Sequence, residues 1–237
     1  MIDQDSTEFV EAFVSAARPG EPRGRPGWWM AMIAVSVVFA VALASLLNGA
    51  LSGGGSAQAS GTWTAVAGPS CTSDGTSFMK VGYYTGAARK SADWTTSATG
   101  GYSSGGCTGG FVSVPMSGNI AAYHSNRYAL WTFDLNATLS RGASCRLSTY
   151  VPDVTTRSAV GGAPAHYYYY ETAYVPGLPV KPAGTYAVNQ VANLGHWVVN
   201  RSFSVTGGHV SVRMVDAGAS RVARDAAAQV RLSCSAT

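Results

Sequence analysis

The stretches YALWTFDL at residues 128–135 and CRLSTYV at residues 145–151 decide the fold class of this 237-residue chain. Apolar and polar residues alternate along much of both, and β-branched and aromatic residues are frequent. Side chains of a strand point alternately to its two faces, so a period of two is typical of a strand with one buried face. We therefore predict two strands here and place Trp131 in the core.

Segments of the same kind recur between turn residues, at 111–114, 186–190, 196–199, 209–214 and 228–232. Short strands at such spacing, with Gly or Pro at the joints, are typical of an antiparallel sandwich. Residues 61–237 are long enough for one all-β domain, and we predict a jelly-roll-like β-sandwich. Trp197, in one of these segments, is also expected in the core.

The run WWMAMIAVSVVFAVALASLL at residues 28–47 has no charged residue and the ~20 residues that a membrane-spanning helix needs. Three arginines precede it, and the next basic residue after it is Lys80. The positive-inside rule then places residues 1–27 in the cytoplasm and the β-sandwich outside the cell membrane. We predict an uncleaved signal-anchor; the alternative is secretion after cleavage following Ala59.

Two short regions flank this predicted span. In residues 5–17 the apolar side chains have helical spacing, which predicts a short amphipathic helix in the cytoplasm. Residues 48–60 are rich in Gly and Ser and read as a flexible tether. After the span there are 13 basic and 7 acidic residues, and the basic residues form no block, so we expect no nucleic-acid partner.

All of the cysteines lie after the predicted span, where the compartment is oxidising: Cys71, Cys107, Cys145 and Cys234. An even number predicts two disulfides, for which three connectivities exist. We favour Cys71 with Cys107, which bracket a loop-rich stretch, and Cys145 with Cys234, whose strands can lie side by side. No Cys-x-x-Cys or His spacing indicates a metal site.

Several motifs occur in a fixed order: ADWTTSATGGY at 92–102, then CRLSTYVP at 145–152, TYAVNQVANLGHWV at 185–198 and ARDAAAQVRL at 223–232. In this order they resemble the golvesin C-terminal-like domain, which is similar to the carbohydrate-binding domain of xanthan lyase. The resemblance covers about residues 78–237 and implies a noncatalytic β-sandwich on exported or envelope proteins. The cysteine pairs and residues 170–181 depart from the family pattern. Asp225, in the last motif, is expected to make a structural hydrogen bond.

The sequence favours a binding module over an enzyme. Gly101–Gly105 fits G-x-S-x-G and Ser77–Lys80 fits S-x-x-K, but neither has the helix that the motif requires. No cofactor fingerprint appears, so we predict no catalytic residue and no cofactor. The run HYYYY at 166–170 offers flat faces for sugar rings, and we nominate Tyr168, Tyr170 and Tyr174 as ligand-facing.

Two functions follow. The first is a membrane-tethered module on a bacterial cell surface that recognises a glycan or another envelope polymer. The alternative is a single-pass sensor or assembly protein, in which the β-sandwich binds a protein partner and the N-terminal helix engages a cytoplasmic one.

Overall fold

The computed structural model describes residues 62–82, 94–135 and 139–237. The predicted membrane span at 28–47, the helix at 5–17 and the tether at 48–60 lie outside these residues. Within the described ranges, no helix has the length and apolar character to cross a membrane. Ala59–Thr237 form one compact unit, which contains every element described below.

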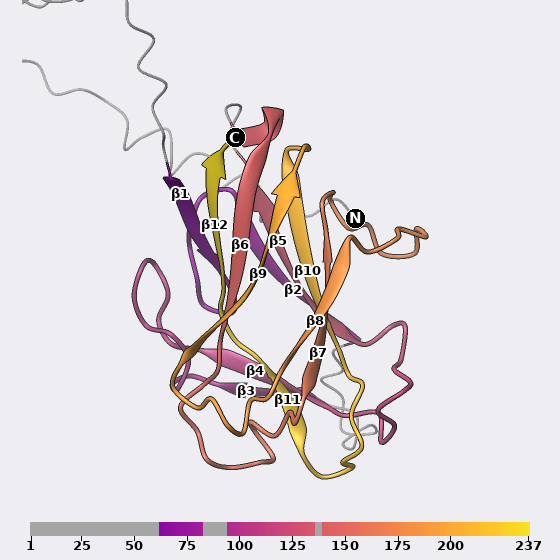
Figure 1. Ribbon diagram of the computed structural model, residues 1–237. Coiled ribbons are helices and arrows are strands. Elements are labelled where there is room, and N and C mark those ends of the chain that lie inside the picture. Colours follow the sequence, from indigo (N-terminus) through magenta and orange to yellow (C-terminus); the bar gives the residue numbers. More distant parts are fainter. Residues whose placement is uncertain (1–61, 83–93, 136–138) are drawn as a thin grey trace, which may run out of the picture. The chain divides into compact units, whose positions relative to one another are not determined.

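The described residues form three antiparallel sheets, shown in Figure 1. The first sheet has four strands, in the order β1 (Thr62–Ala67), β12 (Val230–Ala236), β6 (Ala143–Tyr150) and β9 (Trp197–Val205). The second has five, in the order β2 (Thr76–Val81), β5 (Tyr128–Asp134), β10 (His209–Val215), β7 (Ala165–Tyr170) and β8 (Gly184–Val188). The third has three, in the order β11 (Arg224–Ala227), β4 (Phe111–Pro115) and β3 (Thr95–Ser97). A 3-10 turn, η2 (Leu139–Arg141), precedes β6.

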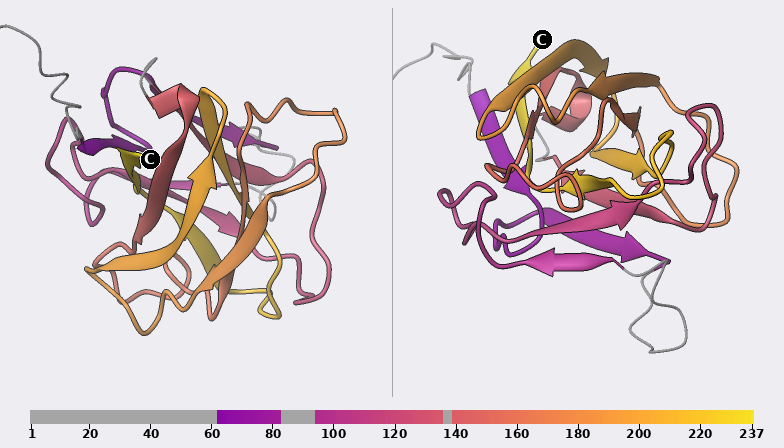
Figure 2. Two further views of the ribbon diagram at one scale, coloured as in Figure 1. Left: turned by 45° about the horizontal axis from the view of Figure 1, so that its top comes forward. Right: turned by 90° about the horizontal axis from the view of Figure 1, so that it is seen from below.

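The first and second sheets form the two layers of a β-sandwich, and the third lies at one end of them (Figures 1 and 2). The chain passes repeatedly from one layer to the other, for example from β6 to β7 and from β8 to β9. Core side chains come from both layers, with Trp131 and Phe133 from β5 and Leu147 and Leu232 from β6 and β12. Their burial is the main force that holds the layers together.

Each predicted strand segment overlaps a strand, and the all-β class is confirmed for the described residues. Trp131 is fully buried as expected, and its indole Nε1 donates to the backbone oxygen of Ala228 at 2.9 Å. The core prediction for Trp197 is wrong, because that side chain is half-buried at the start of β9. The segment 228–232 starts its strand only at Val230, since Gln229 turns its side chain inward.

Gln229 lies in the short gap between β11 and β12, and its hydrogen bonds explain this gap. Its amide Nε2 donates to the backbone oxygens of Pro69 (3.2 Å) and Gly110 (2.7 Å), and its Oε1 accepts from the backbone N–H of Tyr102 (2.8 Å). One fully buried side chain therefore joins the β1–β2 loop, at Pro69, to the β3–β4 loop, at Tyr102 and Gly110. Buried polar groups need such partners, which fixes the position of Gln229.

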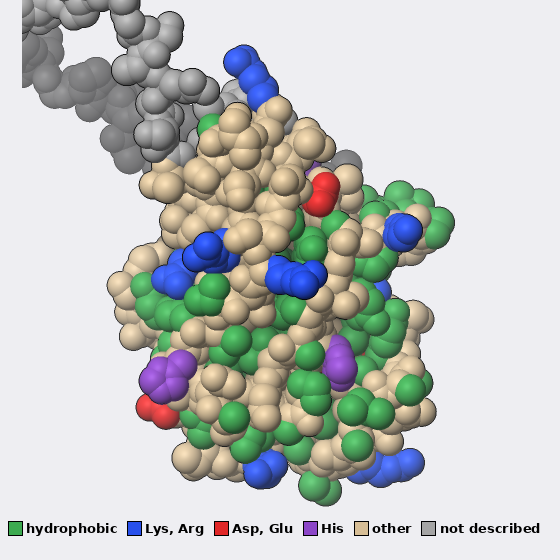
Figure 3. Space-filling model, in the orientation of Figure 1, with side chains coloured by type: hydrophobic (Ala, Val, Ile, Leu, Met, Phe, Trp, Pro, Cys, Tyr) green, Lys and Arg blue, Asp and Glu red, His purple; other side chains and the backbone are tan. Residues whose placement is uncertain are grey.

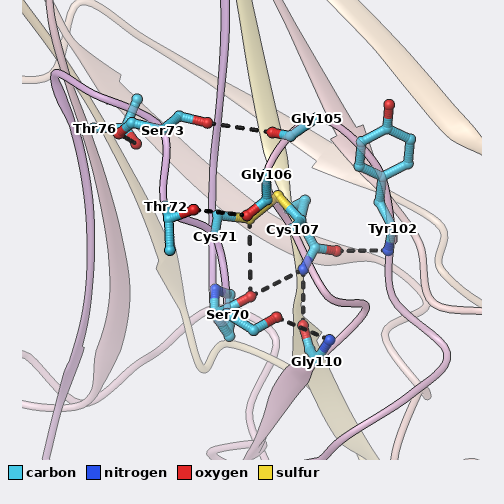
Figure 4. The surroundings of a disulfide bond; sticks show 12 residues. Ser70, Cys71, Thr72, Ser73, Thr76, Tyr102, Gly105, Gly106, Cys107 and Gly110 are labelled. Atoms are coloured by element: carbon cyan, nitrogen blue, oxygen red, sulfur yellow. Dashed lines mark hydrogen bonds between the residues drawn. A yellow bond between two sulfur atoms is a disulfide. The ribbon is translucent and has the colours of Figure 1, made fainter.

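Both disulfides have the predicted pairing. Cys145 and Cys234 lie directly opposite each other on β6 and β12, with 4.1 Å between their Cα atoms. Cys71 and Cys107 join two loops, whose backbones also bond each other through Thr72 and Gly106 (Figure 4). Gly110 donates its N–H to the Ser70 hydroxyl beside this bridge, at 3.0 Å.

Candidate functional site

The tyrosine run of β7 divides its side chains between the two faces of the second sheet. Tyr167 is buried in the core, where its ring stacks on Tyr186 with 4.7 Å between centroids. Tyr169 points the same way and packs on Phe203. Tyr168 and Tyr170 lie on the outer face, so the period-two alternation of the run is confirmed.

Two loops cover this outer face. The loop at 119–127 is held by Asp216, whose buried carboxylate accepts from the His124 backbone N–H at 2.8 Å and forms an ion pair with Arg127. The loop at 171–183 is held by Ser211, whose hydroxyl accepts from the Tyr174 N–H (3.0 Å) and donates to the Thr172 oxygen (2.9 Å). Each loop brings one tyrosine, Tyr123 or Tyr174, over the sheet.

The side chains between these loops form a cluster of tyrosine rings around one arginine, here called the tyrosine cluster. Ring centroids lie 4.9 Å apart for Tyr170 and Tyr174, 5.8 Å for Tyr128 and Tyr174, and 5.9 Å for Tyr123 and Tyr168. Contacts in this range are the usual tilted or edge-to-face packing of aromatic rings. The cluster comprises Tyr123, Tyr128, Tyr168, Tyr170, Tyr174 and Arg213.

Arg213 occupies the centre of the cluster. Its guanidinium carbon lies 4.2 Å from the ring centroid of Tyr128, 5.3 Å from that of Tyr123 and 5.5 Å from that of Tyr174. These distances allow cation–π attraction to all three rings. Nη2 donates to the backbone oxygen of Ser125 at 3.1 Å, and only 7% of the residue is exposed.

A pocket of about 470 Å³ opens above this arginine. Tyr123, Tyr128 and Tyr174 line it together with Arg213, and the Pro176–Pro179 turn of the loop at 171–183 forms one wall. Leu178 of that turn is 58% exposed, and Val175 is 46% exposed. The pocket thus combines flat aromatic faces, phenol hydroxyls and a guanidinium, a set that suits a ligand with both rings and polar groups.

Three phenols of the cluster have a shifted pKa. Burial raises the pKa of Tyr128, Tyr168 and Tyr170 above the ordinary value. Arg213 opposes this rise in the pKa of all three, and it also hydrogen-bonds Tyr170. The hydroxyls are therefore hydrogen-bond donors and acceptors at neutral pH, as recognition of hydroxyl or carboxylate groups requires.

The structure brings the three nominated residues together in this cluster. Tyr174 lines the pocket, and Tyr168 lies half-buried against Tyr123. Tyr170 is only 3% exposed and supports Tyr174 from below. Sequence reasoning missed Arg213, although its place in HVSVRMV, on the opposite face from Val212 and Met214, was a signal.

A second aromatic group lies beside the first sheet. Tyr102 and Tyr150 contact the ring of Trp197 at 5.0 and 5.3 Å between centroids, and the Arg231 guanidinium lies 4.4 Å from the Trp197 ring. A shallow hollow of about 330 Å³ on the first sheet is lined mainly by Ser and Thr. Most of the surface seen over the first sheet is neither hydrophobic nor charged, apart from scattered Lys and Arg (Figure 3).

The strings that resemble catalytic motifs lie in other settings. Ser103 belongs to the turn beside the Cys71–Cys107 disulfide, and Ser77 lies on β2, where its hydroxyl bonds that of Thr132. Neither serine opens a helix. Within the described residues, no three His, Cys, Asp or Glu side chains are grouped as a metal site.

Asp225 departs from its expected role. It is fully buried, and neither carboxylate oxygen has a hydrogen-bond partner among the described residues, so the predicted structural hydrogen bond is wrong. Burial, and then the charge of Asp216, raise the pKa of Asp225 well above its ordinary value. The carboxyl therefore tends to keep its proton in the folded protein.

Comparison with known proteins gives no family for this chain: no family model and no curated protein matches it. Among solved structures, the K1 cleaved adhesin domain of Lys-gingipain from Porphyromonas gingivalis W83 is similar at 12% identity and a TM-score of 0.36, covering 74% of this chain and 99% of that one. A Stig cyclase from Fischerella sp. TAU is similar at 14% identity and a TM-score of 0.34, covering 68% of this chain and 86% of that one. At these scores the likeness carries no argument about function, and the resemblance to the golvesin C-terminal-like domain stays a prediction.

Proposed function

We propose that residues 62–237 are a noncatalytic module that binds a glycan or another cell-envelope polymer at the tyrosine cluster. The observation that carries this proposal is the pocket of about 470 Å³ above Arg213, with tyrosine faces on several sides. Aromatic faces stack on the apolar faces of sugar rings, while neutral phenols bond their hydroxyls. The predicted span at 28–47 would hold the module outside the membrane.

The cluster is also built to keep its shape. The ion pair at Asp216 and the hydrogen bonds of Ser211 fix the loops that carry Tyr123 and Tyr174. A site whose side chains are already ordered loses little conformational entropy on binding. The golvesin-like motifs support the same proposal, since that family implies a noncatalytic envelope module.

The test uses the full-length chain in detergent micelles, with binding to bacterial and plant polysaccharides and to whole cell walls. We expect saturable binding that is lost when Tyr174→Ala and Tyr168→Ala are combined. The matched control is Tyr102→Ala, which removes a half-buried tyrosine from the aromatic group at Trp197. Loss of binding in the control alone would move the site to the first sheet, and the absence of binding to any polymer would overturn the proposal.

The second candidate function is the sensor or assembly role with a protein ligand. The exposed apolar side chains of Val175 and Leu178 beside the pocket favour it, because such groups are common at protein interfaces. In this role, Phe9 and Phe13 of the predicted N-terminal helix would contact the cytoplasmic partner; both lie outside the described residues. If the protein is a sensor or assembly protein, Phe9→Ala combined with Phe13→Ala should abolish its function. If it is a polymer-binding module, the same double variant should bind its polymer as the wild type does.

A further inference from the structure

Arg213 is a buried cation whose hydrogen-bonding capacity is largely unused. A guanidinium has five N–H donors, yet the donations seen are from Nη2 to Ser125 and the bond with Tyr170. Its Nε is buried and has no hydrogen-bond partner among the described residues. Burial of a charge is costly unless the charge is paired, so this arrangement has a place for one more partner.

No carboxylate in the described part of the chain supplies that partner. Asp216 forms an ion pair with Arg127 and contacts the His124 imidazole, and Asp134 contacts the His209 imidazole. Asp216, which directly follows β10, is therefore already paired with residues of the loop at 119–127. Around the pocket, Arg127 offsets the charge of Asp216, and the charge of Arg213 is left in excess.

We propose that Arg213 binds an anionic group of the ligand, a carboxylate or a phosphate, so that the polymer recognised here is acidic. This inference rests on the proposed function and narrows its ligand class. The planar fork of a guanidinium matches the two oxygens of either anion, and Arg213 lines the pocket that gives access to it. The tyrosine rings of the pocket then lie beside the sugar or backbone that carries the anion.

The aromatic surroundings of Arg213 strengthen such a contact. The rings of Tyr123, Tyr128 and Tyr174 exclude water from the guanidinium, and a charged pair is screened less where water is excluded. The same rings hold the guanidinium plane in place before the ligand arrives. The pocket therefore favours an acidic polymer over a neutral polymer with the same backbone.

The experiment compares polymers on the full-length chain in detergent micelles: polygalacturonate for the carboxylate, poly(glycerol phosphate) for the phosphate, and dextran as the uncharged polymer. We expect at least tenfold tighter binding of one acidic polymer than of dextran, with affinity that falls as salt rises. Arg213→Gln should weaken that binding at least tenfold, and Arg213→Lys should weaken it less, because lysine keeps the charge but not the fork. Arg201→Gln, the same change at an exposed residue of β9, should leave it within twofold.

A measurement on the unmodified protein covers the case in which Arg213→Gln does not fold. Galacturonate should raise the thermal midpoint of the wild-type chain, and galactose at the same concentration should not. Equal binding of dextran and the acidic polymers, or acidic binding that Arg213→Gln leaves unchanged, would overturn the anionic ligand while the tyrosine pocket still binds. Absence of binding to every polymer would overturn the proposed function and this inference together.

Discussion

The carboxylate of Asp216, fully buried at the end of β10, is paired with the guanidinium of Arg127, which is 13% exposed in its side chain. Asp216→Asn would leave the Arg127 charge without its partner, and we expect the free energy of unfolding to fall by about 3 kcal/mol. Urea denaturation followed by circular dichroism measures this. The control is Asp134→Asn, which breaks the exposed pair with His209 and should change stability little. An equal loss in both variants would contradict a structural role for the Asp216 pair.

The two disulfides should differ in their access to reductant. Cys145 and Cys234 are 1% and 2% exposed, whereas Cys71 is half-buried between two loops. Without denaturant, a small thiol should therefore open Cys71–Cys107 first and leave Cys145–Cys234 intact. Alkylation with peptide mass mapping at successive times gives the order. Simultaneous opening of both bridges would mean that reduction proceeds only through global unfolding.

The Cys145–Cys234 bridge should also contribute more to stability than the Cys71–Cys107 bridge. It spans 89 residues, against 36 for Cys71–Cys107. On the chain-entropy model, replacing Cys145 and Cys234 together by Ala costs about 4.5 kcal/mol, and the shorter bridge costs about 0.8 kcal/mol less. Equilibrium unfolding of the two double variants tests the order.

Asp225 should make stability fall as the pH rises. Its pKa is raised in the folded protein, mainly by burial, so its contribution is complete below the unfolded value near pH 4 and is lost as the pH rises toward the folded value. Asn has nearly the same shape and does not titrate. We expect Asp225→Asn to match the wild type near pH 4 and to become more stable above it, by up to about 1.4 kcal/mol per pH unit. Unfolding curves at pH 4, 5.5 and 7 test this, and a constant difference would contradict it.

Strands were predictable here because each carries its own signal. The alternation in β5, β6 and β10, with their β-branched and aromatic residues, indicates strands without knowledge of the neighbouring strand. It does not show that nearly all side chains of β5 and β10 are buried, on both faces of the sheet. The Cys145–Cys234 pairing followed from the same local reading, since both residues lie within strand-like segments. The order of strands in the sheets has no such local signal.

The tyrosine cluster was predictable only in part, because its long-range contacts leave no local signal in the sequence. The alternation within HYYYY separates Tyr168 and Tyr170 from Tyr167, but it does not tell which face the loops cover. Tyr123 and Tyr174 reach the cluster because Asp216 and Ser211 hold their loops, contacts between residues about 90 and 37 positions apart. Only the folded chain reveals that these loops enclose Arg213.

Trp131 and Trp197 provide a final test, because the sequence predicts the same core position for both and the structure separates them. Trp131→Phe removes the donor to the buried oxygen of Ala228 and leaves space beside the ring, so it should cost about 2–3 kcal/mol. Trp197→Phe affects a half-buried ring whose main contacts are other aromatic rings and Arg231, and should cost less than about 1 kcal/mol. Urea unfolding followed by far-ultraviolet circular dichroism avoids the loss of tryptophan fluorescence. Similar costs for the two variants would place Trp197 in the core after all and remove the half-exposed aromatic group from the first sheet.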